Sequence, residues 1–452
     1  MPPNTIYALN GDFSKAYTTI VEGQGVYVLD EDGKRYVDAI GGVGVANIGH
    51  GVEEVIEAIT NKARRLAFSY SGLVDFQPRQ ALAAKLQAWA PAGMGATKTL
   101  FCSGGSEANE AALKLAYQNH TERGNPSKQK IIRRWQSYHG NTIGALSMSG
   151  RTQWRRRYAP YLLDFPHTPS PYCYRCPWGK GGSDCCLEWA NDLRRIISQE
   201  GAENISAFIA EPIIGTSMSA VVPPPPEYYG IIRDICDEND ILFIVDEVMT
   251  GVGRTGKKWG IEHWGVTPDI ITAAKGLTGG YAPLGATILG ENVWQAMAAG
   301  SGSVTHSYTF GGNPLSCATG VAVLEYIEKN GLVSQAGVMG EKLLSKLRSR
   351  LGNSPFVGDV RGLGLFIGVE LVADKETKQP FSAEWDVTHR VEAAAFANRL
   401  FILGGMTGLI DGVAGDHFEL LPPYTIQDDD LDFIVDTLDK SIDEVMAALP
   451  TN

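Results

Sequence analysis

The chain has 452 residues, a length that suggests two or three domains, and its 39 Lys and Arg against 51 Asp and Glu give a formal net charge of −12. This acidic balance argues against a dedicated nucleic-acid or anionic-membrane binder, because such proteins present a net basic face. No apolar run approaches the roughly 18 residues that span a bilayer, and the N-terminus has no signal-peptide pattern, so we expect a globular cytoplasmic protein.

Short apolar, β-rich runs alternate with helical patterns through the middle of the chain. Continuous apolar strands separated by helices predict a mainly parallel sheet covered on both faces, in an α/β domain. A helix is expected at 106–117, directly after the pair Gly104-Gly105. The expected strands are residues 97–101, 131–135, 207–210, 241–245, 270–273 and 284–289.

The two ends of the chain predict a smaller α+β domain. Near the N-terminus, strands at 25–29 and 35–38 flank the turn pair Asp32-Gly33, and this segment is expected to pack with the C-terminal part. We expect an N-terminal segment (1–60) that contributes to the small domain, a large domain (61–315) and a C-terminal α+β domain (316–452). In the C-terminal part the expected helices are 314–327, 334–351, 385–400 and 429–448, and the expected strands are 357–360 and 365–371, interrupted by residues 361–364.

The chemistry is carried by an acid and a lysine that follow two apolar strands. Asp246 ends the strand 241–245, and Lys275 follows the next strand, flanked by alanines and a glycine. Both side chains then lie at the carboxyl edge of the sheet, where open α/β sheets bind ligands. A desolvated lysine loses its proton readily, as a Schiff-base lysine requires, and an opposing acid can keep a pyridinium nitrogen protonated. Taken singly, such an acid is more often a loop anchor and such a lysine a surface charge.

Two further motifs fit a planar, phosphorylated cofactor. The turn Ser103-Gly104-Gly105-Ser106 precedes a helix, so backbone N–H groups and the Ser106 hydroxyl can form a phosphate cradle. Tyr138, in Tyr-His-Gly, offers a ring for stacking. The alternatives are an ordinary tight turn and a core aromatic.

In this order, these motifs resemble those of class III aminotransferases, the fold-type I enzymes that depend on pyridoxal phosphate (PLP). The resemblance covers about residues 15–445. It also rests on Glu211-Pro212, the run 246–256, the segment from Pro268 to Gly276, 283–286, His306-Ser-Tyr-Thr-Phe310 with Asn313-Pro314, and 361–364.

The resemblance implies a PLP site and a role for each matching residue. Lys275 would form the Schiff base and move the proton, and Asp246 would pair with the pyridine nitrogen. Tyr138 and Val248 would sandwich the ring, and Gly105 and Ser106 would hold the phosphate. Thr309 would reach the phosphate of a neighbouring subunit, which implies a homodimer or a dimer of dimers. His139 and Glu211 complete the implied cofactor-binding set.

The positions that contact substrate in relatives depart from the family pattern. Many relatives pair a glutamate after the Glu-Pro motif with a mobile arginine near the C-terminus, which binds the α-carboxylate of the oxo acid. Here Thr216 stands at the first position, and the segment 404–423 contains no arginine; Glu419 or Gly412 occupies the place. Met249 replaces a glutamine that in some relatives bonds the cofactor.

Another arginine can serve in place of the missing one. The available residues are Arg151, Arg254 and Arg361, of which the last two lie inside motifs with expected structural roles.

Four cysteines fall within fourteen residues: Cys173, Cys176, Cys185 and Cys186. Four thiolates could bind zinc or an iron–sulfur cluster, but the adjacent pair makes the spacing imperfect. We favour reduced thiols in an insertion, or a local redox-sensitive pair, and expect no metal.

The sequence therefore predicts a ping-pong aminotransferase that moves an amino group from a small-molecule amine or ω-amino acid to a small 2-oxo acid such as pyruvate. The alternatives are a decarboxylating transaminase or an aminomutase on the same scaffold, and a metal-binding regulatory protein with a vestigial PLP site.

Overall fold

The computed structural model describes residues 17–179, 187–221, 226–405 and 408–450. Its largest sheet has seven strands in the order β4-β10-β9-β8-β7-β5-β6. Strand β10 is antiparallel to both neighbours, while the other pairs are parallel, so the predicted mainly parallel sheet is confirmed. The strands are β4 (Lys98–Cys102), β5 (Lys130–Arg134), β6 (His167–Thr168), β7 (Ile205–Ala210), β8 (Leu242–Asp246), β9 (Ile270–Ala273) and β10 (Gly285–Leu289).

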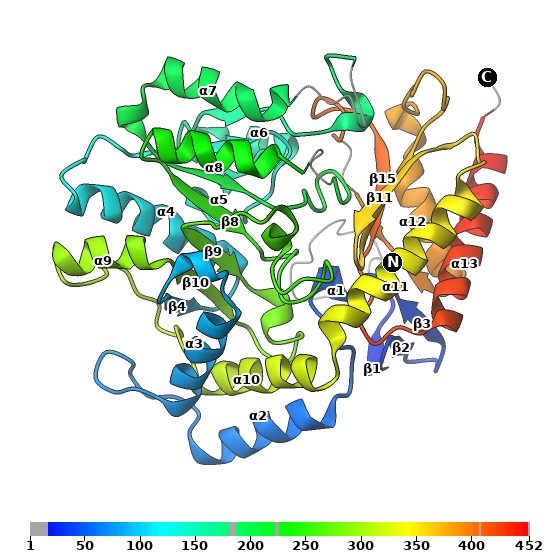
Figure 1. Ribbon diagram of the computed structural model, residues 1–452. Coiled ribbons are helices and arrows are strands. Elements are labelled where there is room, and N and C mark those ends of the chain that lie inside the picture. The colour runs from blue at the N-terminus through cyan, green and yellow to red at the C-terminus, as the bar shows by residue number, and fades with distance from the viewer. Residues whose placement is uncertain (1–16, 180–186, 222–225, 406–407, 451–452) are drawn as a thin grey trace.

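Helices cover both faces of this sheet (Figure 1). Successive residues of a strand point to opposite faces, and in β7 every residue is buried. Ala207 and Ile209 pack with α4 (Gly105–Glu122) and α9 (Glu291–Ala299) in one apolar cluster. Phe208 belongs to a second cluster with α7 (Glu188–Glu200) and α8 (Tyr228–Glu238) on the other face. Burial on both faces explains why these strands are continuously apolar.

The smaller α+β part contains two four-stranded sheets. One is antiparallel, in the order β11-β12-β15-β14, and the other has the order β1-β2-β3-β13. Strand β3 pairs in parallel with β13, so the N-terminal segment does pack with the C-terminal part, as the sequence predicts. The strands are β1 (Ile20–Gln24), β2 (Tyr27–Asp30), β3 (Arg35–Asp38), β11 (Val357–Leu363), β12 (Phe366–Leu371), β13 (Leu400–Phe401), β14 (Leu403–Gly404) and β15 (Asp416–Leu420).

The C-terminal helices also form where the periodicity predicts them. Helix α10 begins with an Asn-Pro signature: the side chain of Asn313 accepts hydrogen bonds from the N–H groups of Leu315 and Ser316, and Pro314 occupies the first turn. The remaining helices are α1 (Gly41–Gly44), α2 (Glu53–Arg65), α3 (Gln77–Trp89), α5 (Ile143–Met148), α6 (Thr152–Tyr158), α10 (Pro314–Lys329), α11 (Leu332–Leu351), α12 (Val387–Ala397) and α13 (Asp428–Ala447). Among the residues described, no helix has the length and apolar character that crossing a bilayer requires.

Two expectations about strands need correction. Strand β11 continues through residues 361–363 instead of breaking there, because its register with β12 holds from Asp359 to Leu363. The sequence analysis also missed β1, β6, β13, β14 and β15. The first of these is largely exposed, three have only two residues, and β15 carries charged residues that the fold buries.

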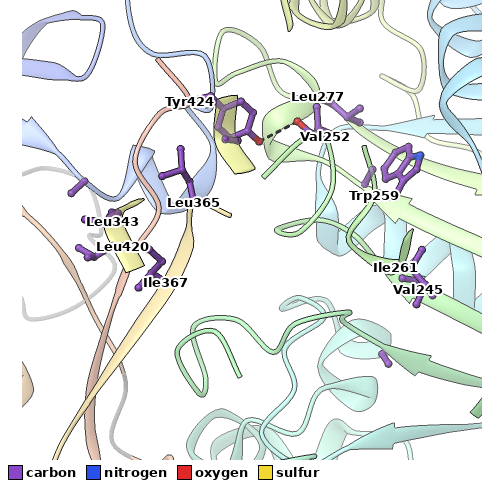
Figure 2. Close-up of a cluster of buried hydrophobic side chains, with 14 of the residues drawn as sticks. Val245, Val252, Trp259, Ile261, Leu277, Leu343, Leu365, Ile367, Leu420 and Tyr424 are labelled. Atoms are coloured by element: carbon purple, nitrogen blue, oxygen red, sulfur yellow. Dashed lines mark hydrogen bonds between the residues drawn. The ribbon is translucent and has the colours of Figure 1, made fainter. Parts of the chain in front are cut away.

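Buried side chains link the two parts of the molecule beside the carboxyl edge of the large sheet. Figure 2 shows Val245 and Trp259 from the large part and Leu365 and Leu420 from the small part around this region. The hydroxyl of Tyr424 donates a hydrogen bond of 3.1 Å to the carbonyl oxygen of Val252, which joins the two sides. The carboxyl edge of the large sheet is therefore held firmly against the small part.

Candidate active site

Lys275 and Asp246 lie at the carboxyl edges of neighbouring strands. Asp246 is the last residue of β8 and pairs in register with Thr272 of β9, three residues before the lysine. Lys275 opens a short 3₁₀ turn and has a φ of +45°, a left-handed conformation that non-glycine residues adopt at an energetic cost. Its Nζ donates a hydrogen bond of 3.1 Å to the carbonyl oxygen of Val43.

The surroundings of Lys275 make its amine easy to deprotonate. Burial lowers its pKa to about 8, and the charges of Arg254 and Arg151 act in the same direction. Glu419 and Asp246 oppose the shift. A substantial fraction of the amine is therefore unprotonated near neutral pH, as covalent attack on a carbonyl requires.

Asp246 is held by three donors. Asn109 Nδ2 and His139 Nδ1 each lie 2.8 Å from Asp246 Oδ2, and the backbone N–H of Val248 donates to Oδ1 at 3.0 Å. Thr272 Oγ1 in turn donates to Asn109 Oδ1 at 2.7 Å, which fixes the orientation of the Asn109 amide. These bonds stabilise a carboxylate in a site that is almost fully buried.

The sequence analysis missed Asn109. The available signal was an Asn among the alanines on the apolar face of the helix that follows the glycine turn, where a polar side chain needs a partner.

His139 Nε2 is also buried and has no hydrogen-bond partner among the described residues.

The turn before α4 forms an open cradle. The helix has 18 residues and begins after Gly104, so the N–H groups of its first turn are available to an anion. The N–H of Asn141 donates to Ser106 Oγ at 3.1 Å. A Cβ at Gly105 would lie 2.9 Å from Val248 Cγ1, so only glycine lets Val248 approach the cradle this closely.

The backbone of Tyr138 is held by a buried pair of charged residues, Glu211 and Arg134. Its N–H donates to Glu211 Oε1 at 3.2 Å, and Glu211 Oε2 lies 3.7 Å from the guanidinium of the fully buried Arg134. Burial raises the pKa of Glu211, and the charges of His139 and Arg134 oppose this. The ring of Tyr138 makes an edge contact with Trp154 at 5.6 Å between centroids.

A lysine with a readily lost proton, an acid held by three donors and a helix N-terminus next to a tyrosine fit PLP in chemical type. Residues 10–442 match the family model of class III aminotransferases. The chain belongs to this family. Class III aminotransferases depend on PLP and have the fold-type I architecture, so the predicted family, fold class and cofactor are confirmed.

Known relatives of this class III aminotransferase cover nearly its whole length. It is 35% identical to the uncharacterized aminotransferase YodT of Bacillus subtilis over 96% of this chain and 97% of YodT. It is 34% identical to the taurine–pyruvate aminotransferase of Bilophila wadsworthia over 94% of this chain and 92% of that protein. The PLP-bound crystal structure of an amine transaminase from an uncultivated Pseudomonas species superposes with a TM-score of 0.90 at 32% identity, over 97% of this chain and 98% of the other.

Thr309 lies apart from this network of buried residues. It is exposed in the turn that precedes α10, next to Phe310, which is 60% exposed. The neighbouring Tyr308 hydroxyl donates to the carbonyl oxygen of Glu107, in the first turn of α4. Contact of Thr309 with a second subunit remains a prediction.

The cysteine group is described only in part. Cys173 and Cys176 are of intermediate exposure, whereas Cys185 and Cys186 lie outside the described residues. Within the described part of the aminotransferase, no three His, Cys, Asp or Glu side chains gather in a way that could hold a metal ion.

Glu419 and Gly412, the two positions at which relatives would carry the missing arginine, have different surroundings. Glu419, on β15, is fully buried, and its charge acts on that of Lys275. Gly412 instead packs against Thr152 at the start of α6, where a Cβ would overlap the Thr152 hydroxyl. Met249 places its sulfur 2.9 Å from the position that a Cβ at Gly215 would take, so this glycine makes room for the thioether.

Two of the three arginines considered as substitutes are structural. Arg254 Nη1 donates to the carbonyl oxygens of Leu365 and Pro422, at 3.1 and 2.6 Å. Arg361 pairs with Asp359 and Glu370 and also donates to two backbone carbonyl oxygens. Both arginines therefore hold segments of the fold together, although Nε and Nη2 of Arg254 have no hydrogen-bond partner among the described residues.

Proposed function

We propose that this class III aminotransferase transfers an amino group from an amine or a single-carboxylate ω-amino acid to a small 2-oxo acid, with pyruvate preferred, in a ping-pong reaction. The observation that carries the proposal is the Lys275 amine, with a pKa of about 8, just after β9, the strand that pairs with β8 of Asp246. The name of the taurine–pyruvate relative supports pyruvate as acceptor.

Each residue of the site has a defined task in this proposal. Lys275 Nζ would hold the cofactor and would accept and return the substrate proton. Asp246 holds the proton on the ring nitrogen, and Asn109 and His139 keep the carboxylate oriented. PLP supplies the electron sink that makes loss of the substrate proton possible at neutral pH.

The remaining residues bind and orient. The N–H groups of Gly105 and Ser106 bind the phosphate, and Tyr138 and Val248 enclose the ring. Glu211 supports the backbone of Tyr138 through its hydrogen bond. Thr309 completes the phosphate site of a second subunit, so the active unit is a homodimer or a dimer of dimers.

Glu419 supports the proposed choice of donor. It is a buried acid beside Lys275, and a second anion on the donor would lie near it without a partner. Donors whose far end is neutral or cationic avoid this cost.

A donor screen tests the proposal. Purified holoenzyme is mixed with single amines without any oxo acid, and loss of the absorbance of the lysine-linked cofactor is followed. We expect the absorbance to fall with amines or ω-amino acids and to return on addition of pyruvate. No change with any such donor, while 2-amino dicarboxylates react, would contradict the proposal.

A further inference from the structure

Two charged side chains beside Lys275 lack partners. Among the described residues, neither Arg151 nor Glu419 makes an ion pair, and both carboxylate oxygens of Glu419 are buried without a partner of hydrogen-bonding geometry. The nearby backbone N–H of Ala220 and the charges of Lys275 and Arg151 favour the ionised form of Glu419. Buried charges are normally paired, so an arginine without an ion-pair partner within electrostatic reach of Lys275 indicates a site for an anionic ligand.

Arg151 is held by aromatic rings rather than by acceptors. Its guanidinium carbon lies 5.1 Å from the ring centre of Tyr138 and 4.4 Å from that of Trp154. Its Nε is buried and has no hydrogen-bond partner in the described part of the chain. Stacking fixes the plane of the guanidinium and leaves its N–H donors free, which is the arrangement that suits two-point binding of a carboxylate.

Arg151 also lies within electrostatic reach of the reacting lysine. Its charge lowers the pKa of Lys275, and the charges of Glu419 and Glu211 act on Arg151 itself. Arg254 acts on Lys275 too, but its guanidinium is bonded to carbonyl oxygens of the fold. Of the three arginines considered, Arg151 is thus the one that donates no hydrogen bond to another described residue, whereas Arg254 and Arg361 are each bonded to backbone carbonyl oxygens.

Ser217 provides a second hydrogen-bond donor next to Arg151. Arg151 and Ser217 line one small cavity of about 20 Å³, together with Gln136, Thr152, Gln153, Gly408 and Gly412. The Ser217 hydroxyl is buried and has no partner among the described residues. A cavity of this size has room for one water molecule, or equally for one oxygen of a ligand.

We infer that Arg151 binds the carboxylate of the oxo acid acceptor, with Ser217 as an additional donor. This inference rests on the proposed function, since it names the residue that recognises the acceptor. Because burial favours the neutral form of Glu419, that side chain does not repel a carboxylate bound by Arg151 at neutral pH.

The test measures carboxylate binding apart from turnover. Propionate, which has neither an oxo nor an amino group, is titrated into the holoenzyme by calorimetry. Arg151→Gln should weaken propionate binding about 100-fold, because a buried charge-assisted contact is lost. Arg151→Lys keeps the charge but not the two-point geometry, so we expect a loss of about tenfold. Arg157→Gln, at an exposed arginine of the same helix, is the matched control and should bind like the wild type.

Turnover with two acceptors separates recognition from structural support. Arg151→Gln should lower kcat/KM about 100-fold for pyruvate and less than threefold for propanal, which lacks the carboxylate. Equal losses for both acceptors, or propionate binding as in the wild type, would overturn the inference. If the wild type binds propionate through Arg151 but transfers no amino group to pyruvate, the proposed acceptor is wrong while the carboxylate site stands. Should Arg151→Gln fail to fold, Arg151→Lys decides by the same two measurements.

Discussion

The amine of Lys275 is hydrogen-bonded to the backbone carbonyl of Val43, at 3.1 Å. Val43 belongs to the N-terminal segment, just after β3, and itself has a positive φ of 65°. Lys275 is therefore positioned by a segment more distant in sequence than any other part of the candidate site. Both partners hold strained backbone conformations, which persist only where the surrounding structure imposes them.

Lys275→Ala should leave the fold intact and remove the covalent link to the cofactor. Turnover should fall by several orders of magnitude, because the group lost is both nucleophile and general base. Borohydride reduction of the wild type, followed by peptide mapping, should place the label on Lys275. A label on another lysine would contradict the assignment.

Asp246→Asn should retain the cofactor but lose most of the activity. An amide cannot keep the ring nitrogen protonated, and its NH₂ group would face donors from Asn109, His139 or Val248. Activity near that of the wild type would mean that another acid takes this role. Glu247 is the neighbouring acid that could take this role, but its carboxylate already accepts hydrogen bonds from the Thr250 hydroxyl and from the N–H groups of Gly260 and Ile261.

Donor preference follows from the charge of the pocket. Half-reaction rates should be higher for putrescine and β-alanine than for glutamate, because the second carboxylate of glutamate would be buried near Glu419 without a cation to pair with. Asp416 does not add to this effect, since its carboxylate is bonded to the N–H and hydroxyl of Thr388 on α12. If glutamate were the best donor by tenfold, equivalent to about 1.4 kcal/mol, the substrate assignment would be wrong.

Glu419 makes the stability of the cofactor-free protein depend on pH. Burial raises its pKa from 4.5 to about 8, Glu211 adds to the shift, and Lys275 and Arg151 oppose it. The folded state therefore holds the proton more tightly than the unfolded state. This contributes stability that is complete below about pH 4.5 and is lost as the pH rises towards 8.

Glu419→Gln should remove this component. The free energy of unfolding should fall less steeply between about pH 5 and 8 in the variant than in the wild type, as measured by urea titration at each pH. Glu247, whose pKa burial raises to about 7, contributes a slope of the same sign in both proteins, so the difference isolates Glu419. Identical slopes would show that Glu419 is not buried as described.

Two glycine-to-alanine substitutions should change the free energy of unfolding in opposite directions. Gly368, on β12, pairs with Glu419, and a Cβ there would overlap the carbonyl oxygen of Ser219. Gly368→Ala should lower the free energy of unfolding by about 2 kcal/mol or more, because backbone must move. Gly230 lies within α8, and no atom lies within 4 Å of the position that an added methyl group would take, so Gly230→Ala should raise stability by about 0.5 kcal/mol. Thermal unfolding of both variants checks the pair.

The large sheet was predictable because its strands are buried on both faces and are therefore continuously apolar, as in Leu242–Asp246. Strand β15 was not predictable, since three of its residues, Asp-His and then Glu, are polar although every residue of the strand is buried. For the same reason the position of Glu419 beside Lys275 could not be derived from sequence. Motif order predicted a site at Lys275 and Asp246, but the anchoring of Asp246 by Asn109 depends on a contact between residues 137 positions apart.

The pairing of β3 with β13 also constrains the order in which the chain can fold during its synthesis. Val37 finds its partner Leu400 only after nearly the whole polypeptide has been synthesised. On the ribosome, the N-terminal strands must therefore wait with an open edge while the large sheet is already able to form. Such an edge is a template for pairing with other chains, so early termination before residue 400 should give products that depend on chaperones to stay unaggregated.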